Sequence, residues 1–130
     1  MNAVGEKPTR SLNVLVVEDE REVQGLIVLR LTQRGHGVTA VSTGREAIRV
    51  LDSGSFDVVV ADVLLPDGDG LDVMSHVRGK PNSPRLVAIS GGGRYASADY
   101  CRTLALETGA KVALLKPFKT GELVAAVEET

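Results

Sequence analysis

Five short apolar runs alternate along the chain with segments in which apolar residues recur every three or four positions. The apolar runs span residues 12–17, 36–41, 57–62, 86–90 and 111–115. The periodic segments between and after them span residues 20–34, 42–51, 70–77, 97–107 and 121–128. Short continuous apolar runs are typical of buried strands, and the longer periodicity is typical of helices with one buried face. The pattern therefore predicts five strands, each followed by a helix.

Strict alternation of apolar strands with helices favours an α/β fold in which a parallel sheet is covered on both faces. The runs at 12–17 and 57–62 are the most uniformly apolar, so we expect them to be the central strands. With right-handed crossovers, these expectations lead to a doubly wound, flavodoxin-like sheet of strand order 2-1-3-4-5. In such a sheet, the carboxyl ends of strands one and three border the ligand crevice.

Length and composition limit the classes of protein. The 130 residues suit one domain, predicted at 12–130 after a polar tail at 1–11. A formal net charge of -2, with both signs mixed along the chain, gives no basic surface for nucleic acid. The single cysteine, Cys101, excludes an internal disulfide and is expected to be a small packing residue. The sequence has no signal peptide and no apolar stretch long enough for a membrane span, so a soluble cytoplasmic protein is expected.

Polar residues follow the apolar runs at their carboxyl ends. Glu18 and Asp19 follow the first run, Asp62 ends the third, Ser90 ends the fourth and Lys116 follows the fifth. Parallel strands bring these ends to one edge of the sheet, where the clustered carboxylates repel one another unless a cation is present. The sequence thus predicts a site for a hard divalent ion, Mg²⁺, with oxygen ligands. There Asp62 can attack phosphorus, while Ser90 and Lys116 bind phosphoryl oxygens.

The set of residues resembles the receiver (CheY-like) domain of two-component response regulators. The resemblance rests on Glu18-Asp19, Asp62, Ser90 and Lys116-Pro117-Phe118, together with Pro66 and Gly70 at the family's spacing after Asp62, and it covers about residues 12–129. The individual motifs are short, and the set as a whole is specific.

The resemblance implies a role for each matching residue. Asp62 would accept a phosphoryl group from a sensor histidine kinase or a histidine phosphotransfer protein. Glu18, Asp19, Asp62 and the backbone carbonyl of Leu64 would hold Mg²⁺, with Mn²⁺ as a substitute. Ser90 would contact the phosphoryl group, and Lys116 would form a salt bridge to it. The chain would catalyse only its own phosphorylation and dephosphorylation.

The resemblance also implies protein partners. A downstream protein would bind the face formed by the segments 97–107, 111–115 and 121–128, and phosphorylation could drive homodimerisation. No contact with nucleic acid or membrane is expected. Because the sequence ends soon after its last predicted helix, we expect a stand-alone regulator. The alternatives are a receiver from a larger regulator with an output domain, and a receiver-like interaction module that works without phosphorylation.

A phosphatase or phosphotransferase with an aspartyl intermediate is a competing class. Enzymes of the haloacid dehalogenase type carry a second acid two residues after the nucleophile, and here that residue is Leu64. Receivers tune the hydrolysis of their aspartyl phosphate at this position and at the position of Gly92. Neither residue can hold a water through a side-chain hydrogen bond, so slow dephosphorylation is expected.

The sequence departs from the family in two places. Ala113 occupies a position where receivers usually carry an aromatic switch residue, so the usual switch is expected to be absent or altered. The spacing from Ser90 to Lys116 is also longer than usual, with the extra residues placed in 91–98. Tyr95 or Tyr100 could supply the missing ring.

Four other features have simpler interpretations. Glu20 is expected to be an early helix residue favoured by the helix dipole rather than a metal ligand. The segment 67–70 fits a turn that caps the next helix better than a calcium loop. The glycines at 91–93 fit a loop, because no Gly-Lys-Ser/Thr motif of a phosphate loop follows them. His36 and His76 are expected at the surface.

Overall fold

The computed structural model describes residues 10–63, 70–91, 97–107 and 109–129, in which five strands alternate with five helices. The strands are β1 Asn13–Val17, β2 Gly37–Val41, β3 Val58–Asp62, β4 Arg85–Ser90 and β5 Val112–Leu115. The helices are α1 Arg21–Gln33, α2 Gly44–Ser53, α3 Gly70–Arg78, α4 Ala98–Glu107 and α5 Thr120–Glu128. Every element lies within two residues of its predicted range.

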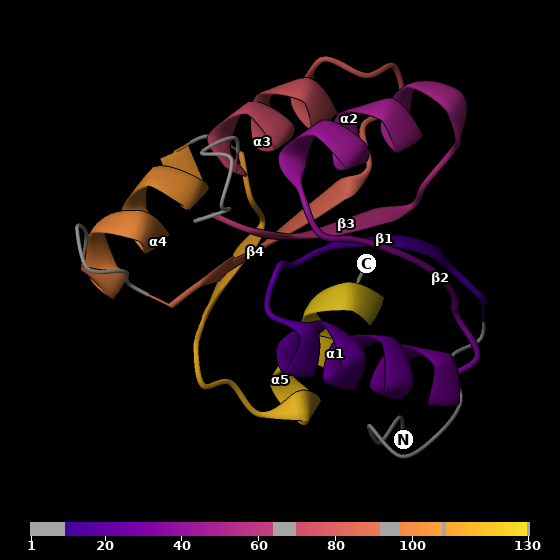
Figure 1. Ribbon diagram of the computed structural model, residues 1–130, viewed down its shortest axis with the longest axis horizontal. Helices are drawn as coiled ribbons and strands as arrows, with labels where there is room; N and C mark the ends of the chain where they lie inside the picture. The colour runs from indigo at the N-terminus through magenta and orange to yellow at the C-terminus, as the bar shows by residue number, and fades with distance from the viewer. Residues whose placement is uncertain (1–9, 64–69, 92–96, 108, 130) are drawn as a thin grey trace.

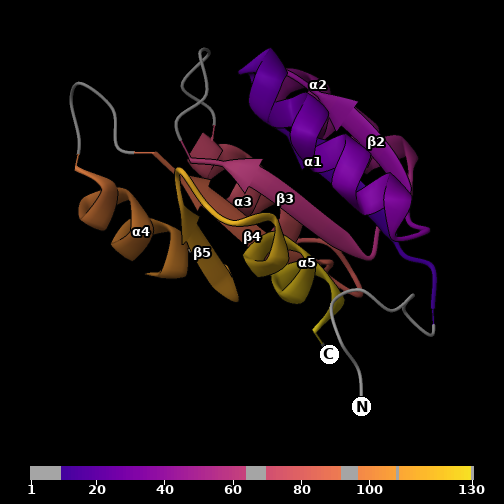
Figure 2. The same cartoon turned by 90° about the horizontal axis from the view of Figure 1, so that it is seen from below.

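The five strands form one parallel sheet of order β2-β1-β3-β4-β5. Helices α1 and α5 cover one face, and α2, α3 and α4 cover the other (Figure 1). Figure 2 shows the same layers from below. The predicted doubly wound, flavodoxin-like fold is therefore confirmed. None of the helices in the described ranges is long and apolar enough to cross a membrane.

Each face of the sheet has its own apolar core, because successive strand residues point to opposite faces. Val14 and Val16 of β1 pack in the core beneath α1 and α5, whereas Leu15 and Val17 pack in the core beneath α2, α3 and α4. All four side chains are fully buried. Burial on both faces accounts for the continuous apolar runs. The parallel pairing of the strands brings their carboxyl ends to one edge of the sheet.

Gly70 brings the start of α3 against the end of β3. A Cβ atom at this position would lie 2.0 Å from the carbonyl oxygen of Val63 and 2.8 Å from that of Asp62. No side chain fits at such distances, so only glycine allows this close approach. Gly70 thereby fixes the start of α3 against the backbone of Asp62.

The expected surface position of His36 is wrong. His36 is only 5% exposed, and its Nδ1 accepts a hydrogen bond of 3.1 Å from the backbone N–H of Leu12. Its Nε2 therefore carries the proton and donates to Glu128 Oε2 at 2.9 Å. The last turn of α5 covers this corner of the sheet and supplies the polar partner that burial requires. His76, in contrast, is partly exposed and contacts Asp52 Oδ1 at 2.8 Å.

Candidate functional site

Asp62 and Glu18 lie side by side at the carboxyl edge of the sheet. Val17 of β1 pairs with Ala61 of β3, so the next residues of these two strands are adjacent. Both carboxylates are buried, with Glu18 fully enclosed and Asp62 3% exposed. Burying two like charges so close together is unfavourable without a compensating cation.

Lys116 supplies a positive charge at this point. It follows β5, and its Nζ lies 2.9 Å from Asp62 Oδ2 and 2.7 Å from Glu18 Oε1. Its Nζ also lies 2.7 Å from Glu20 Oε1. The stem of Lys116 passes close to Gly91, where a Cβ atom would lie 3.1 Å from Lys116 Cδ. One ammonium group therefore bridges three carboxylates.

The environment shifts the pKa values of Glu18 and Lys116. Burial raises the pKa of Glu18 to about 7, because removal from water disfavours its charged form more than the contact with Lys116 and the hydrogen bond from the Glu20 backbone favour it. Burial lowers the pKa of Lys116, but its contacts with the three carboxylates outweigh burial and raise that pKa above its ordinary value. Lys116 is therefore charged throughout the physiological pH range.

Ser90 lies on the strand next to Asp62. It is the last residue of β4 and is fully buried, and its carbonyl oxygen accepts a hydrogen bond of 2.9 Å from the backbone N–H of Lys116. On the same strand, Ile89 pairs with Asp62, and its carbonyl oxygen accepts a hydrogen bond from the N–H of Val63. The fold thus brings Ser90 and Lys116 to the edge where Asp62 ends β3.

The predicted metal ligands lie in different environments. Glu18 and Asp62 belong to a group of carboxylate oxygens that lie within 4.8 Å of one another, and the third member is Glu20. Asp19 is exposed beside Glu18 and does not join this group. Leu64 lies outside the described residues, so its carbonyl ligand stays a prediction.

The donor set fits a hard divalent ion. Glu18 Oε1 is buried and contacts Lys116 Nζ as an ion pair, but among the described residues it has no hydrogen-bond partner. A buried carboxylate oxygen with unused lone pairs, beside two further carboxylates, is suited to coordinate Mg²⁺. When bound, the ion would offset the negative charge of these carboxylates.

Glu20 was expected to be an early helix residue, but it lies just before α1 and its side chain contacts Lys116. It precedes α1 as the residue at its amino-terminal boundary, and its side chain makes no capping hydrogen bond to the helix. Its backbone N–H donates to Glu18 Oε2 at 3.1 Å, while its side chain reaches Lys116. The sequence pattern did not indicate this pair, because the two residues are 96 positions apart.

Gln24 also supports the site, although the sequence pattern did not indicate it. From α1, its side-chain amide donates to the carbonyl oxygens of Glu18 at 2.8 Å and Val41 at 3.0 Å. These hydrogen bonds tie α1 to the ends of β1 and β2. The only signal in the sequence is a glutamine next to the apolar stripe of the first periodic segment.

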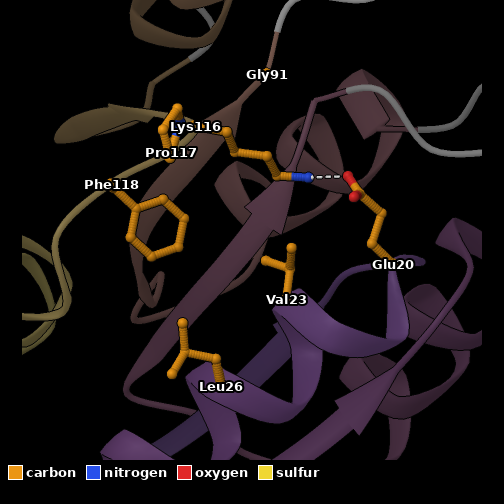
Figure 3. A pocket seen from close by; sticks show the side chains of 7 residues that line it. All are labelled: Glu20, Val23, Leu26, Gly91, Lys116, Pro117 and Phe118. Atoms are coloured by element: carbon orange, nitrogen blue, oxygen red, sulfur yellow. Dashed lines mark hydrogen bonds and ion pairs between the residues drawn. The ribbon is translucent and has the colours of Figure 1, made fainter.

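A groove of about 420 Å³ adjoins the carboxylate cluster between α1 and the segment that follows β5. Figure 3 shows Lys116 reaching across its rim to Glu20, with Val23, Leu26 and Phe118 along the groove. Leu26, which lines the groove, is 46% exposed. The groove therefore places an apolar surface beside the carboxylate cluster.

Only some of the positions at which the sequence departs from the family's pattern lie within the described residues. Ala113 is half-buried and packs on the core beneath α2, α3 and α4. Tyr100 is 57% exposed on α4, so its ring does not fill the position that Ala113 leaves small. Tyr95, Gly92 and most of the 67–70 and 91–93 segments lie outside the described residues, as does the side chain of Cys101.

Comparisons with known proteins agree with the observed fold. The family model described as "Response regulator receiver domain" matches residues 14–128. The transcriptional regulatory protein TcrA of Mycobacterium tuberculosis is 36% identical over 114 residues, which cover 88% of this chain and 44% of that protein. The chain thus spans less than half the length of this relative.

Solved structures of response regulators are also similar to this chain. A putative response regulator from Chloroflexus aurantiacus has a TM-score of 0.80 and 28% identity, covering 91% of this chain and 95% of that one. The receiver domain of Ssk1 from Saccharomyces cerevisiae, crystallised with the histidine phosphotransfer protein Ypd1, has a TM-score of 0.77 and 20% identity, covering 90% of this chain and 86% of that one. At 20% identity the second likeness concerns the fold alone. The family match over residues 14–128 shows that the chain belongs to the response regulator receiver domains.

Proposed function

We propose that Asp62 accepts a phosphoryl group from a histidine kinase or a histidine phosphotransfer protein. The observation that carries this proposal is the buried Asp62 carboxylate held 2.9 Å from Lys116 Nζ at the carboxyl edge of the sheet. A carboxylate oxygen of Asp62 attacks phosphorus, the bond from phosphorus to the donor breaks, and the donor leaves with the electron pair. The product is an aspartyl phosphate.

Lys116 and Ser90 bind the transferred group. The ammonium of Lys116 already lies against Asp62, so it is placed to neutralise charge on the phosphoryl oxygens without a large movement. Ser90 ends the neighbouring strand and offers a hydroxyl. The ligands proposed for Mg²⁺ are Glu18, Asp19, Asp62 and the Leu64 carbonyl, and Mn²⁺ would substitute for it. The ion supplies charge neutralisation when bound.

The phosphodonor partner is proposed by analogy of fold. The Ssk1 receiver was crystallised with a histidine phosphotransfer protein, and a protein of that class would present a phosphohistidine to Asp62. We propose that the chain turns over no other substrate. Neither Leu64 nor Gly92 can hold a water through a side-chain hydrogen bond, so we propose that the aspartyl phosphate is hydrolysed slowly.

The face formed by α4, β5 and α5 is proposed to bind a downstream protein or a second copy of the chain. Tyr100 and Leu106 of α4 are 57% and 43% exposed, and large exposed apolar side chains favour protein contacts. Phosphorylation-dependent association would appear as a change in elution volume or light-scattering mass after loading with phosphoryl donor. An unchanged mass would exclude the homodimer.

Signalling through protein contacts as a stand-alone regulator remains our proposal. The alternative, a receiver within a longer regulator, is favoured by TcrA, of which the matched region covers only 44%. An immunoblot of source cells with an antibody against this chain separates the two. A band at the mass of 13.7 kDa supports the stand-alone form, and a larger band supports the longer regulator.

Incubation with acetyl phosphate and Mg²⁺ tests the proposed reaction. The expected result in the intact mass spectrum is one phosphoryl adduct, which is absent when the divalent ion is chelated. Absence of an adduct with any small donor or kinase would favour an interaction module that works without phosphorylation. Continuous release of product from a small phosphate ester would favour a phosphatase.

A further inference from the structure

The three carboxylates around Lys116 differ in exposure. The side chains of Glu18 and Asp62 are 0% and 5% exposed, whereas that of Glu20 is 59% exposed. A buried carboxylate that loses its ammonium partner is left without solvation, which is costly. An exposed carboxylate can exchange the same contact for water at little cost. Glu20 is therefore the partner that Lys116 can release most easily.

The backbone aims Glu20 at Lys116. Its N–H donates to Glu18 Oε2 at 3.1 Å, which fixes the chain where it turns into α1. From this point the Glu20 side chain points toward Lys116 Nζ, which donates a hydrogen bond of 2.7 Å to Glu20 Oε1 (Figure 3). An ammonium group has three N–H donors. Two of them form hydrogen bonds to Glu20 and Asp62, and Glu18 Oε1 lies at the same short distance as an ion pair.

We propose that Glu20 is a positioning residue, namely the resting-state counter-ion of Lys116, and that it yields Lys116 to the phosphoryl group on Asp62. This inference rests on the proposed phosphorylation of Asp62. Lys116 Nζ already lies 2.7 Å from oxygens of Glu18 and Glu20 and 2.9 Å from Asp62, so a phosphoryl oxygen can approach the ammonium group only if one of these contacts breaks. The exposed contact to Glu20 breaks, since both other carboxylates are buried.

Release of Glu20 changes a surface as well as the site. Glu20 and Lys116 both line the groove that also contains Val23, Leu26 and Phe118. Figure 3 shows their ion pair beside Val23, Leu26 and Phe118, the apolar part of this groove. When this ion pair breaks, phosphorylation of Asp62 changes the surface of α1. This link does not require a ring at position 113, where the chain has alanine.

The test compares Glu20→Gln with Glu22→Gln, which removes an equal charge from an exposed residue in the first turn of α1. Glu20→Gln should accelerate phosphorylation by acetyl phosphate about threefold to tenfold, because one negative charge near the incoming phosphoryl group is removed. Glu22→Gln should keep the wild-type rate. Equal rates in all three proteins, or a slower Glu20→Gln, would overturn the proposal.

A second readout follows Lys116 itself, through the NMR resonance of its side-chain nitrogen, assigned by its absence in Lys116→Arg. In the unphosphorylated protein this resonance should shift in Glu20→Gln and stay unchanged in Glu22→Gln. Beryllofluoride with Mg²⁺, which mimics the phosphoryl group, should remove the difference between wild type and Glu20→Gln. A resonance insensitive to Glu20→Gln, or a difference that persists with beryllofluoride, would overturn the counter-ion role. A missing phosphoryl adduct in the wild type would instead reject the proposed function.

Discussion

Lys116 Nζ lies 2.9 Å from Asp62 Oδ2, although 54 residues separate them in the sequence. The contact exists because β3, β4 and β5 are parallel neighbours whose carboxyl ends share one edge of the sheet. Lys116 compensates the charge of two buried carboxylates there, Glu18 and Asp62. This arrangement has consequences for stability as well as for chemistry.

Lys116→Met should lower the free energy of unfolding by about 3–5 kcal/mol at pH 8 without divalent ions, because removal of one partner leaves buried charges uncompensated. Urea denaturation measures this change. Added Mg²⁺ should restore part of the loss, since the ion binds the folded state. Lys111→Met, at an exposed position before β5, is the matched control and should change stability by less than ~0.5 kcal/mol. Equal effects of the two variants would contradict the role of Lys116.

Glu18 should make the protein less stable as the pH rises from about 4.5 to about 7, when no divalent ion is present. Its pKa is about 7 in the folded protein and 4.5 as the reference value for the unfolded chain, so the unfolded chain loses its proton first. This loss of unfolding free energy is absent below pH 4.5 and complete above about pH 7. Its upper limit is about 3 kcal/mol. The measurement is the difference in unfolding free energy between wild type and Glu18→Gln across this range. A difference that is constant with pH would exclude the raised pKa.

Glu128 anchors the corner of the sheet opposite the site. It contacts Arg34 at 2.5 Å and His36 at 2.9 Å, and both partners are almost completely buried. Glu128→Gln should therefore destabilise the protein by about 2–4 kcal/mol at neutral pH, whereas Glu129→Gln should have little effect, since Glu129 is 67% exposed. Thermal or urea unfolding of both variants gives the comparison.

The stability that Glu128 gains from Arg34 and His36 should decrease as the pH falls. Burial raises the pKa of Glu128, but the contacts with Arg34 and His36 outweigh burial and hold that pKa below its ordinary value of 4.5. The stabilisation is therefore present above pH 4.5 and lost as the pH falls below it. The stability difference between wild type and Glu128→Gln should shrink on acidification. A difference that grows at low pH would contradict the ion pair.

Gly70 and Gly25 should respond to alanine in opposite directions. Gly70→Ala would place Cβ 2.0 Å from a backbone oxygen, and we expect a loss of about 3 kcal/mol because backbone cannot move aside easily. Gly25 lies within α1, and a Cβ atom there would have no neighbouring atom within 4 Å, so Gly25→Ala should add about 0.5–1 kcal/mol. Unfolding midpoints of the two variants on opposite sides of wild type would bear this out; two shifts of the same sign would not.

The strand and helix boundaries could be predicted because the periodicity of apolar residues directly reflects burial. The same pattern led to the strand order and thus to the neighbourhood of Glu18, Asp62, Ser90 and Lys116. Contacts between side chains far apart in the chain could not be obtained in this way. Glu20 meets Lys116 across 96 positions, and the pattern around Glu20 shows only a helix start.

His36 illustrates the same limit for a polar residue. Its neighbours in sequence are glycines, and its partner Glu128 is 92 positions away at the end of α5. Nothing local distinguishes a histidine buried against such a partner from one in a surface turn. The tertiary packing of α5 decides it, and the carboxylate of Glu128 makes the burial favourable.

A final measurement asks whether Asp62 is the residue that carries the phosphoryl group. Wild type, Asp62→Asn and Asp72→Asn are incubated with acetyl phosphate and Mg²⁺, and their intact masses are compared. Asp72 is an exposed carboxylate in the first turn of α3 and serves as the control. We expect one phosphoryl adduct on wild type and on Asp72→Asn, and none on Asp62→Asn. An adduct of equal abundance on Asp62→Asn would contradict it.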